Sequence, residues 1–477
     1  MTVFNPTLQH PFIRKYLLII GLIFIPFFMG IDSALNPGLT FSLIVVFLYA
    51  LLCFYDLRNS YIVLVFLIPI IPNSLIIDLG SGSSRIFLYR LFVFICFAAF
   101  ATSLFLRKIN LDWTAYHKVG LVFIASMIIN VMFSAKPLTS LKTMVAELWL
   151  SGLLFFFVSF HLTDNEETFK KLLYAAIGAA FLVSLMGFYE FLTGNSIEQS
   201  ALVSYLTPLK GDITIGDWGR GLAVRGGLYR AQATMFHPLG MASYLLFIFP
   251  LLYEYASNGR GRWLWFFTIA GGLGTTLSRA GWFIATAFVG IRMRKNLILT
   301  GILLGVTIFV IIPWYQTHGQ EGSNMLMAGN TDVARFMRID SAINVFKSHP
   351  LTGVGVGHLD LDIFKNVQYR SWDVTLACLL EENGIIGVSI WLFFFLYLVV
   401  RFYKLSHRKE FHLEWAADGL LLGIIASLFN ATFSNSIFQF SQGYLVMMAL
   451  LGSMARIEWK YRINEKTNTA IDSRLSS

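Results

Sequence analysis

The chain has little charge for its length. Charged residues make up 13% of its 477 residues, whereas hydrophobic residues make up 56% and the mean hydropathy is +0.66. A soluble protein usually carries about 25% charged residues, so this chain has roughly half the charge that a water-facing surface needs. The shortage of charge excludes a soluble enzyme and a disordered chain, and it indicates a polytopic membrane protein.

Cysteine is scarce as well. Cys53, Cys96 and Cys378 lie far apart inside apolar runs, and nothing in the chain has the spacing of a disulfide framework or a zinc site. The triplet Asp360-Leu361-Asp362 is a pattern that can hold a divalent metal, but such triplets arise often by chance. We therefore expect no disulfide scaffold, no metal and no cofactor. The net charge of +9 is attributed to basic residues that anchor cytoplasmic loops, so we expect no nucleic-acid partner.

Long apolar runs predict an all-α bundle that crosses the membrane about 12 to 14 times. A spanning helix needs about 20 apolar residues. The candidate spans are 16–31, 39–55, 61–78, 86–106, 117–134, 144–161, 171–193, 238–256, 263–278, 280–291, 297–313, 376–400, 415–434 and 438–454. The pair 263–278 and 280–291 is short for two full crossings. Either count is even, so both termini are expected on the same side.

Basic residues orient this bundle. Most of the 36 Lys and Arg residues fall in loops that a cytoplasmic N-terminus places inside, so both termini are predicted to be cytoplasmic. Arg14 and Lys15 precede the first apolar run as in a signal peptide, but no small-residue cleavage site follows, so the run is expected to remain as a span. The predicted divisions are transmembrane helices at 1–193, 238–313 and 376–454, outer loops at 194–237 and 314–375, which are expected to contain short helices, and a cytoplasmic tail at 455–477.

Arginine and glycine are grouped on the predicted outer face. The first loop carries residues 224–230, which read Val-Arg-Gly-Gly-Leu-Tyr-Arg, and the short turn 276–282 carries Arg279. Guanidinium groups bind phosphate oxygens through paired hydrogen bonds, and glycine lets the backbone approach an anion. The pattern favours a phosphate or diphosphate ligand on a lipid headgroup. The alternative is that these arginines reach membrane phosphates or pair with loop carboxylates: Asp212, Asp217 and Asp332.

The second loop contains a helical pattern at 332–347. Its apolar stripe consists of Phe336, Ile339, Ile343 and Phe346. Thr331 or Asp332 is expected to cap the start, with Arg335 and Arg338 one turn apart close behind it. We expect a short interfacial helix that directs positive charge at an anion, with a small contribution from the helix dipole. The alternative is a lid helix whose arginines are merely solvated.

Histidines and carboxylates of the outer loops are candidate general bases. His237 and His349 both precede proline, and a His-Pro pair more often sets a turn. His358 has no such constraint and is the stronger histidine candidate. Further candidates are the acids at the start of the following span: Asp373, Glu381 and Glu382.

Four ordered segments resemble the O-antigen ligase and polymerase family. Residues 276–282, which contain Ser278-Arg279-Ala280-Gly281, are similar to its Ser-Arg-Gly turn. Residues 335–357 resemble its Arg…His-Pro-Leu-x-Gly-Val-Gly loop, and residues 379–387 its Leu-Leu-x-Glu-x-Gly-x-x-Gly span start. Residues 230–238 resemble its first outer-loop pattern. The match covers roughly 225–400, and the order of the segments is more specific than any one of them.

The resemblance implies a metal-independent glycosyltransferase of a bacterial inner membrane. Such an enzyme takes a glycan from undecaprenyl diphosphate on the outer face and joins it to an acceptor hydroxyl. By position, Arg230, Arg279 and Arg335 would hold the diphosphate, with Arg338 as a neighbour. The implied partners are the lipid-linked glycan donor, a glycan or lipid-linked acceptor, and membrane lipids.

The resemblance also bears on the base. The family often has a His-Asn pair nine residues before the Glu of its Glu-x-Gly, and counting back from Glu382 gives Asp373 here. Asp373 or His358 is therefore expected to be the base. The difference favours a polymerase over a lipid A-core ligase, while ligase activity and transfer to a protein hydroxyl remain open.

A transporter or flippase for lipid-linked sugars is the main alternative. Transporters usually keep ionisable residues or broken helices near the middle of the membrane. Here Glu147, Glu190 and Glu254 lie near span ends, which favours chemistry at the surface. A non-catalytic assembly factor would not need the grouped outer arginines.

Overall fold

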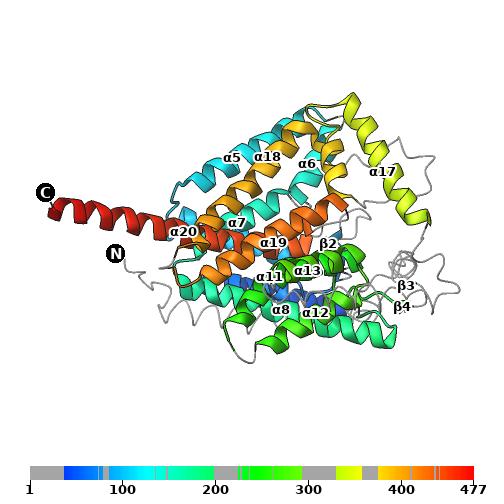
Figure 1. Cartoon of the computed structure of the whole chain (residues 1–477), viewed down its shortest axis with the longest axis horizontal. Coiled ribbons are helices and arrows are strands. Elements are labelled where there is room, and N and C mark those ends of the chain that lie inside the picture. Colours follow the sequence, from blue (N-terminus) through cyan, green and yellow to red (C-terminus); the bar gives the residue numbers. More distant parts are fainter. Residues whose placement is uncertain are drawn as a thin grey trace.

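The computed structural model is a helical bundle (Figure 1). It describes residues 37–73, 75–78, 85–134, 136–146, 149–197, 224–225, 228–235, 237–259, 262–292, 329–356, 374–408, 411–433, 437–439 and 441–476. Of these residues 81% are helical. Within this part of the chain, six helices are long and apolar enough to cross a membrane. The predicted all-α polytopic fold is confirmed, and the spans expected at 16–31 and 297–313 lie outside the described residues.

The helices are α2 (Pro37–Tyr55), α3 (Leu57–Leu67), α4 (Leu88–Phe105), α5 (Ala115–Met132), α6 (Pro137–Ala146), α7 (Trp149–Leu162), α8 (Glu166–Thr193), α11 (Pro238–Ser257), α12 (Trp263–Thr275), α13 (Arg279–Arg292), α17 (Gly329–Ser348), α18 (Thr375–Ser406), α19 (Glu414–Phe433), the short 3-10 helix η4 (Ile437–Gln439) and α20 (Ser441–Ser476). Two antiparallel hairpins accompany them: β1 (Ile76–Asp78) with β2 (Arg85–Phe87), and β3 (Val224–Arg225) with β4 (Leu228–Tyr229). The six apolar helices long enough to span a bilayer are α4, α5, α8, α11, α18 and α19.

One expectation about an element boundary was wrong. The run 61–78 is not one span, because α3 ends at Leu67 and the chain turns into β1. Pro69 and Pro72 explain this end, since proline donates no backbone hydrogen bond and disfavours helix at the residue before it. The described part of the first outer loop contains the β3–β4 hairpin, and most of the loop, where short helices are expected, lies outside the described residues. The predicted tail after Met454 continues α20 as one helix, whose far end projects beyond the bundle (Figure 1).

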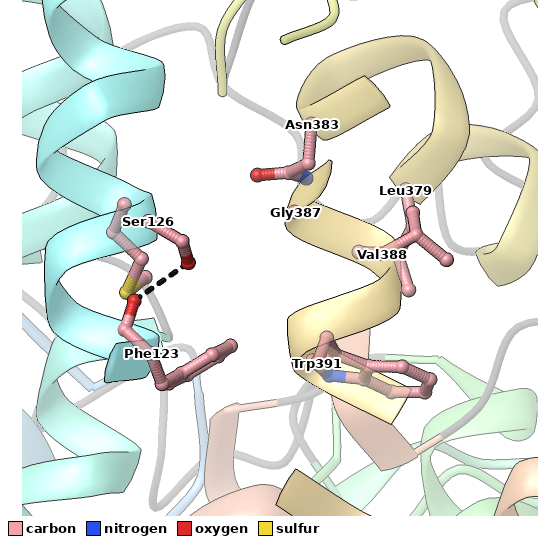
Figure 2. Close-up of a pocket in the computed structure, with 8 residues that line it drawn as sticks. Phe123, Ser126, Leu379, Asn383, Gly387, Val388 and Trp391 are labelled. Atoms are coloured by element: carbon pink, nitrogen blue, oxygen red, sulfur yellow. Dashed lines mark hydrogen bonds between the residues drawn. The ribbon is translucent and has the colours of Figure 1, made fainter. Parts of the chain in front are cut away.

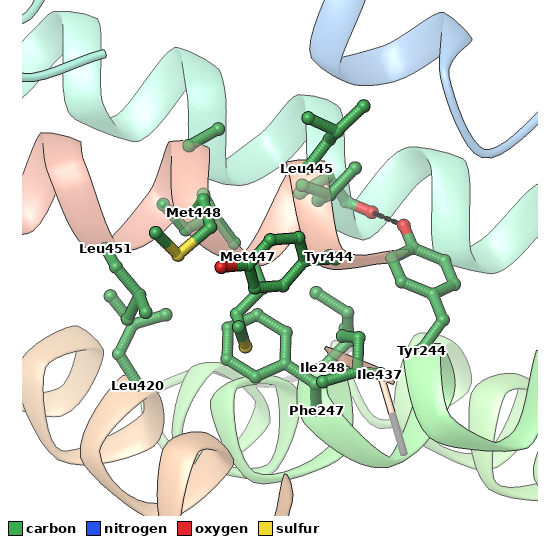
Figure 3. Close-up of a cluster of buried hydrophobic side chains, with 14 of the residues drawn as sticks. Tyr244, Phe247, Ile248, Leu420, Ile437, Tyr444, Leu445, Met447, Met448 and Leu451 are labelled. Atoms are coloured by element: carbon green, nitrogen blue, oxygen red, sulfur yellow. Dashed lines mark hydrogen bonds between the residues drawn. The ribbon is translucent and has the colours of Figure 1, made fainter. Parts of the chain in front are cut away.

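The first half of α20 lies in the core. Figure 3 shows Tyr244 and Phe247 of α11 packed beside Tyr444 and Met447 of α20, and all four side chains are buried. The Tyr244 hydroxyl donates a hydrogen bond to the Ala176 carbonyl oxygen of α8 at 3.0 Å. These contacts pack α20 against α11 and tie α11 to α8 (Figure 3).

Glycines let α7 and α20 approach closely. A Cβ atom at Gly452 would lie 2.1 Å from the Phe156 carbonyl oxygen, and one at Gly152 would lie 2.0 Å from the Tyr444 ring. Lipid tails are as apolar as side chains, so membrane helices associate through close packing of this kind.

Ion pairs hold one end of the bundle together. Arg456 of α20 donates to Asp112, which precedes α5, at 2.6 Å. Arg401 of α18 pairs with Glu458, which also accepts a hydrogen bond from the Tyr116 hydroxyl at 2.8 Å. Further pairs are Arg58–Asp164, Arg292–Glu254, Arg292–Asp418 and Arg408–Glu465. This is the end that the excess of basic residues in the sequence predicts to be cytoplasmic.

At the opposite end, α18 is broken at Gly384, whose φ is 60° and ψ is −171°. The loop at 350–356 bonds to the backbone on both sides of the break. Its four hydrogen bonds run from Val354 N to Glu381 O (3.0 Å), Gly355 N to Glu382 O (3.0 Å), Ile385 N to Pro350 O (2.9 Å) and Ile386 N to Leu351 O (3.2 Å). Unpaired backbone groups are costly where water is excluded, so the loop replaces hydrogen bonds that the helix loses at the break.

Asn130 of α5 completes this arrangement, which we call the α18 joint: Gly384, the loop 350–356 and Asn130. The Asn130 amide donates to the Thr352 carbonyl at 2.8 Å and to the Glu382 carbonyl at 2.7 Å. Its side-chain oxygen accepts from the Val356 N–H at 3.2 Å. A single buried side chain thus connects α5, the loop and α18.

We expect Gly384→Ala to destabilise the protein. A Cβ atom at this position would lie 2.3 Å from the Leu351 carbonyl oxygen, and the backbone conformation alone costs about 1–3 kcal/mol for a residue other than glycine. The thermal unfolding midpoint in detergent measures the loss. Gly274→Ala in α12 is the control, because a Cβ atom there meets nothing within 4 Å. Equal midpoints for the two variants would contradict this account of the joint.

We expect Glu458→Gln to lower stability by about 3 kcal/mol, because it leaves Arg401, whose side chain is only 15% exposed, without its counter-charge. The matched control is Glu465→Gln, which removes the exposed partner of Arg408 and should cost about 0–1 kcal/mol. Thermal unfolding of both variants in the same detergent gives the comparison. If Glu465→Gln lowers the unfolding midpoint as much as Glu458→Gln does, the greater contribution expected of the Arg401–Glu458 pair is wrong.

Candidate functional site

The predicted site residues that the structure describes lie at the end of the bundle opposite the ion pairs. Arg230 follows β4, Arg279 begins α13, and α17 lies across the ends of the bundle helices (Figure 1). The α18 joint is at the same end, since it contacts α5 near Asn130, far from the ion-paired start of that helix. The two outer loops of the sequence therefore meet one end of the structure.

Arg230 is bound to the turn that carries Arg279. Its Nε donates to the Thr276 carbonyl oxygen at 3.2 Å, and the adjacent Ala231 N–H donates to the Thr275 carbonyl oxygen at 3.0 Å. Arg279 itself is exposed. The structure thus brings together two of the arginines that the sequence separates by several elements.

The turn between α12 and α13 is firmly built. Leu277 has a positive φ of 50°, and Ser278 caps α13 by accepting a hydrogen bond from the Gly281 N–H at 3.3 Å. The Trp282 ring Nε1 donates to the Leu273 carbonyl oxygen at 3.2 Å, closing the turn from the side. A turn is thus present where the sequence predicts one, but it covers only 276–278, because α13 already begins at Arg279.

This turn is recessed relative to the end of α8. A Cβ atom at Gly187 would lie 3.1 Å from Thr275 Oγ1, so the two residues are at the same level. Gly187 is six residues before α8 ends at Thr193, which is about 9 Å along a helix. The first outer loop returns inward past the end of α8 to reach the turn.

Glu190 anchors this returning segment, which the sequence did not reveal. Its carboxylate is fully buried and accepts hydrogen bonds from the backbone N–H groups of Ile197, Gln232 and Ala233 at 2.8, 2.8 and 2.7 Å. In the sequence, Glu190 is only an acidic residue near the end of a span. A glutamate a few residues before the glycine that ends a helix is only a weak signal of an anchoring role. Its hydrogen-bond partners are backbone groups, which have no sequence signature.

The second loop contains the predicted helix, with a different start. α17 covers Gly329–Ser348, so Thr331 and Asp332 lie inside its first turn and do not cap it. Arg335 and Arg338 are consequently beyond the first turn, where the helix dipole has little effect. The expected contribution of the dipole was therefore wrong. The structure gives the backbone at both arginines, and their guanidinium groups lie outside the described part.

α17 packs on the start of α18. Ala342 of α17 is buried with Val374 and Ala377, and Ile339 covers them. Ile343, expected in the apolar stripe, is instead 43% exposed. The apolar face of α17 is therefore rotated relative to the prediction, and it includes the small residue Ala342 that the stripe left out.

The two His-Pro pairs set turns, as predicted. His237 caps α11, with Nδ1 accepting from the Leu239 N–H at 3.0 Å. His349 is exposed after α17, and its carbonyl oxygen accepts from the Gly353 N–H at 3.0 Å. The candidate bases His358 and Asp373 lie outside the described residues.

Glu381 and Glu382, the other candidate bases, are 2% and 7% exposed at the α18 joint. Below the joint, α5 and α18 enclose a cavity of about 10 Å³ whose lining includes Ser126, Asn383 and Trp391 (Figure 2). A volume of this size has room for about one water molecule. A glycan cannot bind in this cavity.

Comparison of the chain with protein-family models finds no match, and comparison with curated proteins finds none either.

Proposed function

We propose that this chain is an integral-membrane glycosyltransferase that transfers a glycan from undecaprenyl diphosphate to an acceptor hydroxyl on the outer face of a bacterial inner membrane. The hydrogen bond from Arg230 to the Thr276 carbonyl carries the proposal. It places two guanidinium groups at one turn, and such groups bind diphosphate oxygens through paired hydrogen bonds. As the glycan leaves, negative charge grows on the diphosphate, and fixed positive charge stabilises that state.

The pairing of the four family-like segments supports the proposal. Residues 230–238 contact the turn 276–282 through Arg230, and the loop after α17 pairs with residues 381–386 of α18. Segments distant in the sequence are thereby brought into two contacts at one end of the bundle. A shared substrate gives a reason for collecting them there.

The depth of the turn also suits a lipid headgroup. α8 begins at Glu166, and Gly187, level with Thr275, is about 20 residues along it. A helix of that length reaches the far edge of the bilayer core. The turn with Arg279 is then at the level where the phosphates of a polyprenyl diphosphate emerge.

A transporter of lipid-linked sugars is the second candidate, because α18 is broken and transporters often use broken helices. The break, however, is near the start of α18, and the loop 350–356 fills it. Transporters expose such breaks to a substrate near the middle of the membrane. The break therefore fits a fixed support better than a transport site.

The deciding experiment places purified protein in liposomes with an undecaprenyl-diphosphate-linked repeat unit. A ladder of lengthening lipid-linked chains on a gel identifies a polymerase. One-step transfer after addition of lipid A-core or a carrier protein identifies a ligase or a protein glycosyltransferase. If folded protein gives neither product, the enzyme proposal fails and transport is assayed next.

We expect Arg279→Ala and Arg335→Ala each to lower the initial rate of transfer by about 100-fold or more, because in the proposed site each removes a positive charge that stabilises the leaving diphosphate. Membrane insertion should be unchanged. The control is Arg262→Ala, whose guanidinium stacks on Tyr255 near the start of α12, at the ion-paired end. Full activity of both outer variants would remove the basis for diphosphate binding.

We expect Asp373→Asn to slow transfer more than His358→Ala, because a carboxylate at this position takes the acceptor proton and an amide does not. Initial rates at saturating donor give the ranking. The reverse order would make His358 the base.

A further inference from the structure

We propose that Glu190 is a positioning residue that fastens both ends of the first outer loop and thereby holds Arg230 at the α12–α13 turn. The inference rests on the proposed function, since it explains how a residue that binds the diphosphate is kept in place. Glu190 is near the end of α8, and its side chain has no exposed surface.

The carboxylate bonds to the chain where it leaves α8 and where it returns. One oxygen accepts from the Ile197 N–H, just after α8 ends. The other accepts from the Gln232 and Ala233 N–H groups, just before α11 begins. A single side chain thus closes the loop, and no neutral side chain offers two acceptor oxygens in this geometry.

Residues 230–235, the segment that returns to α11, are also held by other contacts. Gln232 Nε2 donates to Ser196 Oγ at 3.3 Å, and Thr234 Oγ1 donates to the Pro69 carbonyl oxygen. Ala233 has a φ of 50°, a conformation that a residue with a side chain keeps only where its surroundings enforce it. Glu190 supplies that enforcement by accepting the Ala233 N–H.

Arg230 is two residues before Gln232, so the position of its backbone follows from this anchor. Its Nε donates to the Thr276 carbonyl, and Ala231 is bonded to Thr275. Glu190 binds backbone N–H groups, so it acts on the site through the position of Arg230. Burying a carboxylate is costly unless several charge-assisted hydrogen bonds compensate, and three short ones do so here.

The test uses Glu190→Gln in the full-length protein with Leu228→Cys as a reporter on β4. Cys53, Cys96 and Cys378 are buried, so an impermeant maleimide reports the introduced thiol. Binding of undecaprenyl diphosphate, the probe for the site, is measured on the same samples. Glu254→Gln is the matched control, because Glu254 is a buried glutamate at the opposite end, paired with Arg292.

With Glu190→Gln we expect maleimide labelling to become faster by about tenfold, because the segment opens locally. We expect undecaprenyl diphosphate to bind about tenfold more weakly, because the arginine is misplaced. The control should change neither quantity. Glu190→Asp, which keeps the charge but is one methylene shorter, should show both effects in weaker form and serves if the Gln variant does not fold.

Unchanged labelling overturns the anchor. Faster labelling with unchanged binding overturns the positioning role. Equal effects of Glu254→Gln would mean that the changes reflect a general loss of stability, and this outcome also overturns the positioning role. If the parent protein binds no undecaprenyl diphosphate, the proposed function fails together with the positioning role, whereas the labelling rate still reports on loop closure. The two failures are therefore distinguishable.

Discussion

The break in α18 imposes the constraint on which the outer end of the molecule depends. A helix interrupted inside a membrane protein has backbone N–H and C=O groups that no water satisfies, and each costs several kcal/mol if left unpaired. The loop 350–356 supplies the missing partners, and it does so in one register. That register fixes where α17 ends, because the loop follows α17 directly, and so it fixes the helix that carries Arg335.

The same constraint explains the glycines of the loop. A Cβ atom at Gly353 would lie 2.5 Å from the Glu382 carbonyl oxygen, and one at Gly355 would lie 2.7 Å from Oγ of Ser140 in α6. Both residues also have positive φ, at 67° and 105°. The glycines of the Gly-Val-Gly segment are thus needed for close backbone approach to α18 and α6. They serve the joint, and an anion is not required to explain them.

Both outer loops are anchored by a polar side chain from the N-terminal half of the bundle. Asn130 of α5 holds the second loop, and Glu190 of α8 holds the first. In each case the side chain bonds backbone groups from two different segments. The N-terminal helices therefore contribute directly to the arrangement of this end of the bundle.

Local patterns in the sequence predicted the elements well and their pairing poorly. The apolar runs gave most helices, the Ser278-Arg279 turn was predicted in place, and the periodicity of 332–347 gave α17. The early end of α3 is explained by Pro69 and Pro72, which follow it. The prediction of a span at 61–78 weighed only the apolar content of the run. The pairing of the loop with α18, and of Glu190 with Gln232, depends on backbone hydrogen bonds between distant segments, and such bonds leave no pattern in side-chain type. The side-chain positions of Arg335, His358 and Asp373 remain predictions from sequence.

The two ends of the bundle use arginine differently. At the ion-paired end, Arg401, Arg456 and Arg292 bind carboxylates, which neutralise their charge and hold helices together. At the opposite end, Arg230 is tied to the α12–α13 turn by a hydrogen bond to the Thr276 carbonyl oxygen, which takes one of its five N–H donors. The carboxylate that anchors this segment, Glu190, accepts from the backbone N–H groups of Gln232 and Ala233. At this end, therefore, a buried acid holds the backbone that carries an arginine, whereas at the ion-paired end acids hold the arginine side chains themselves.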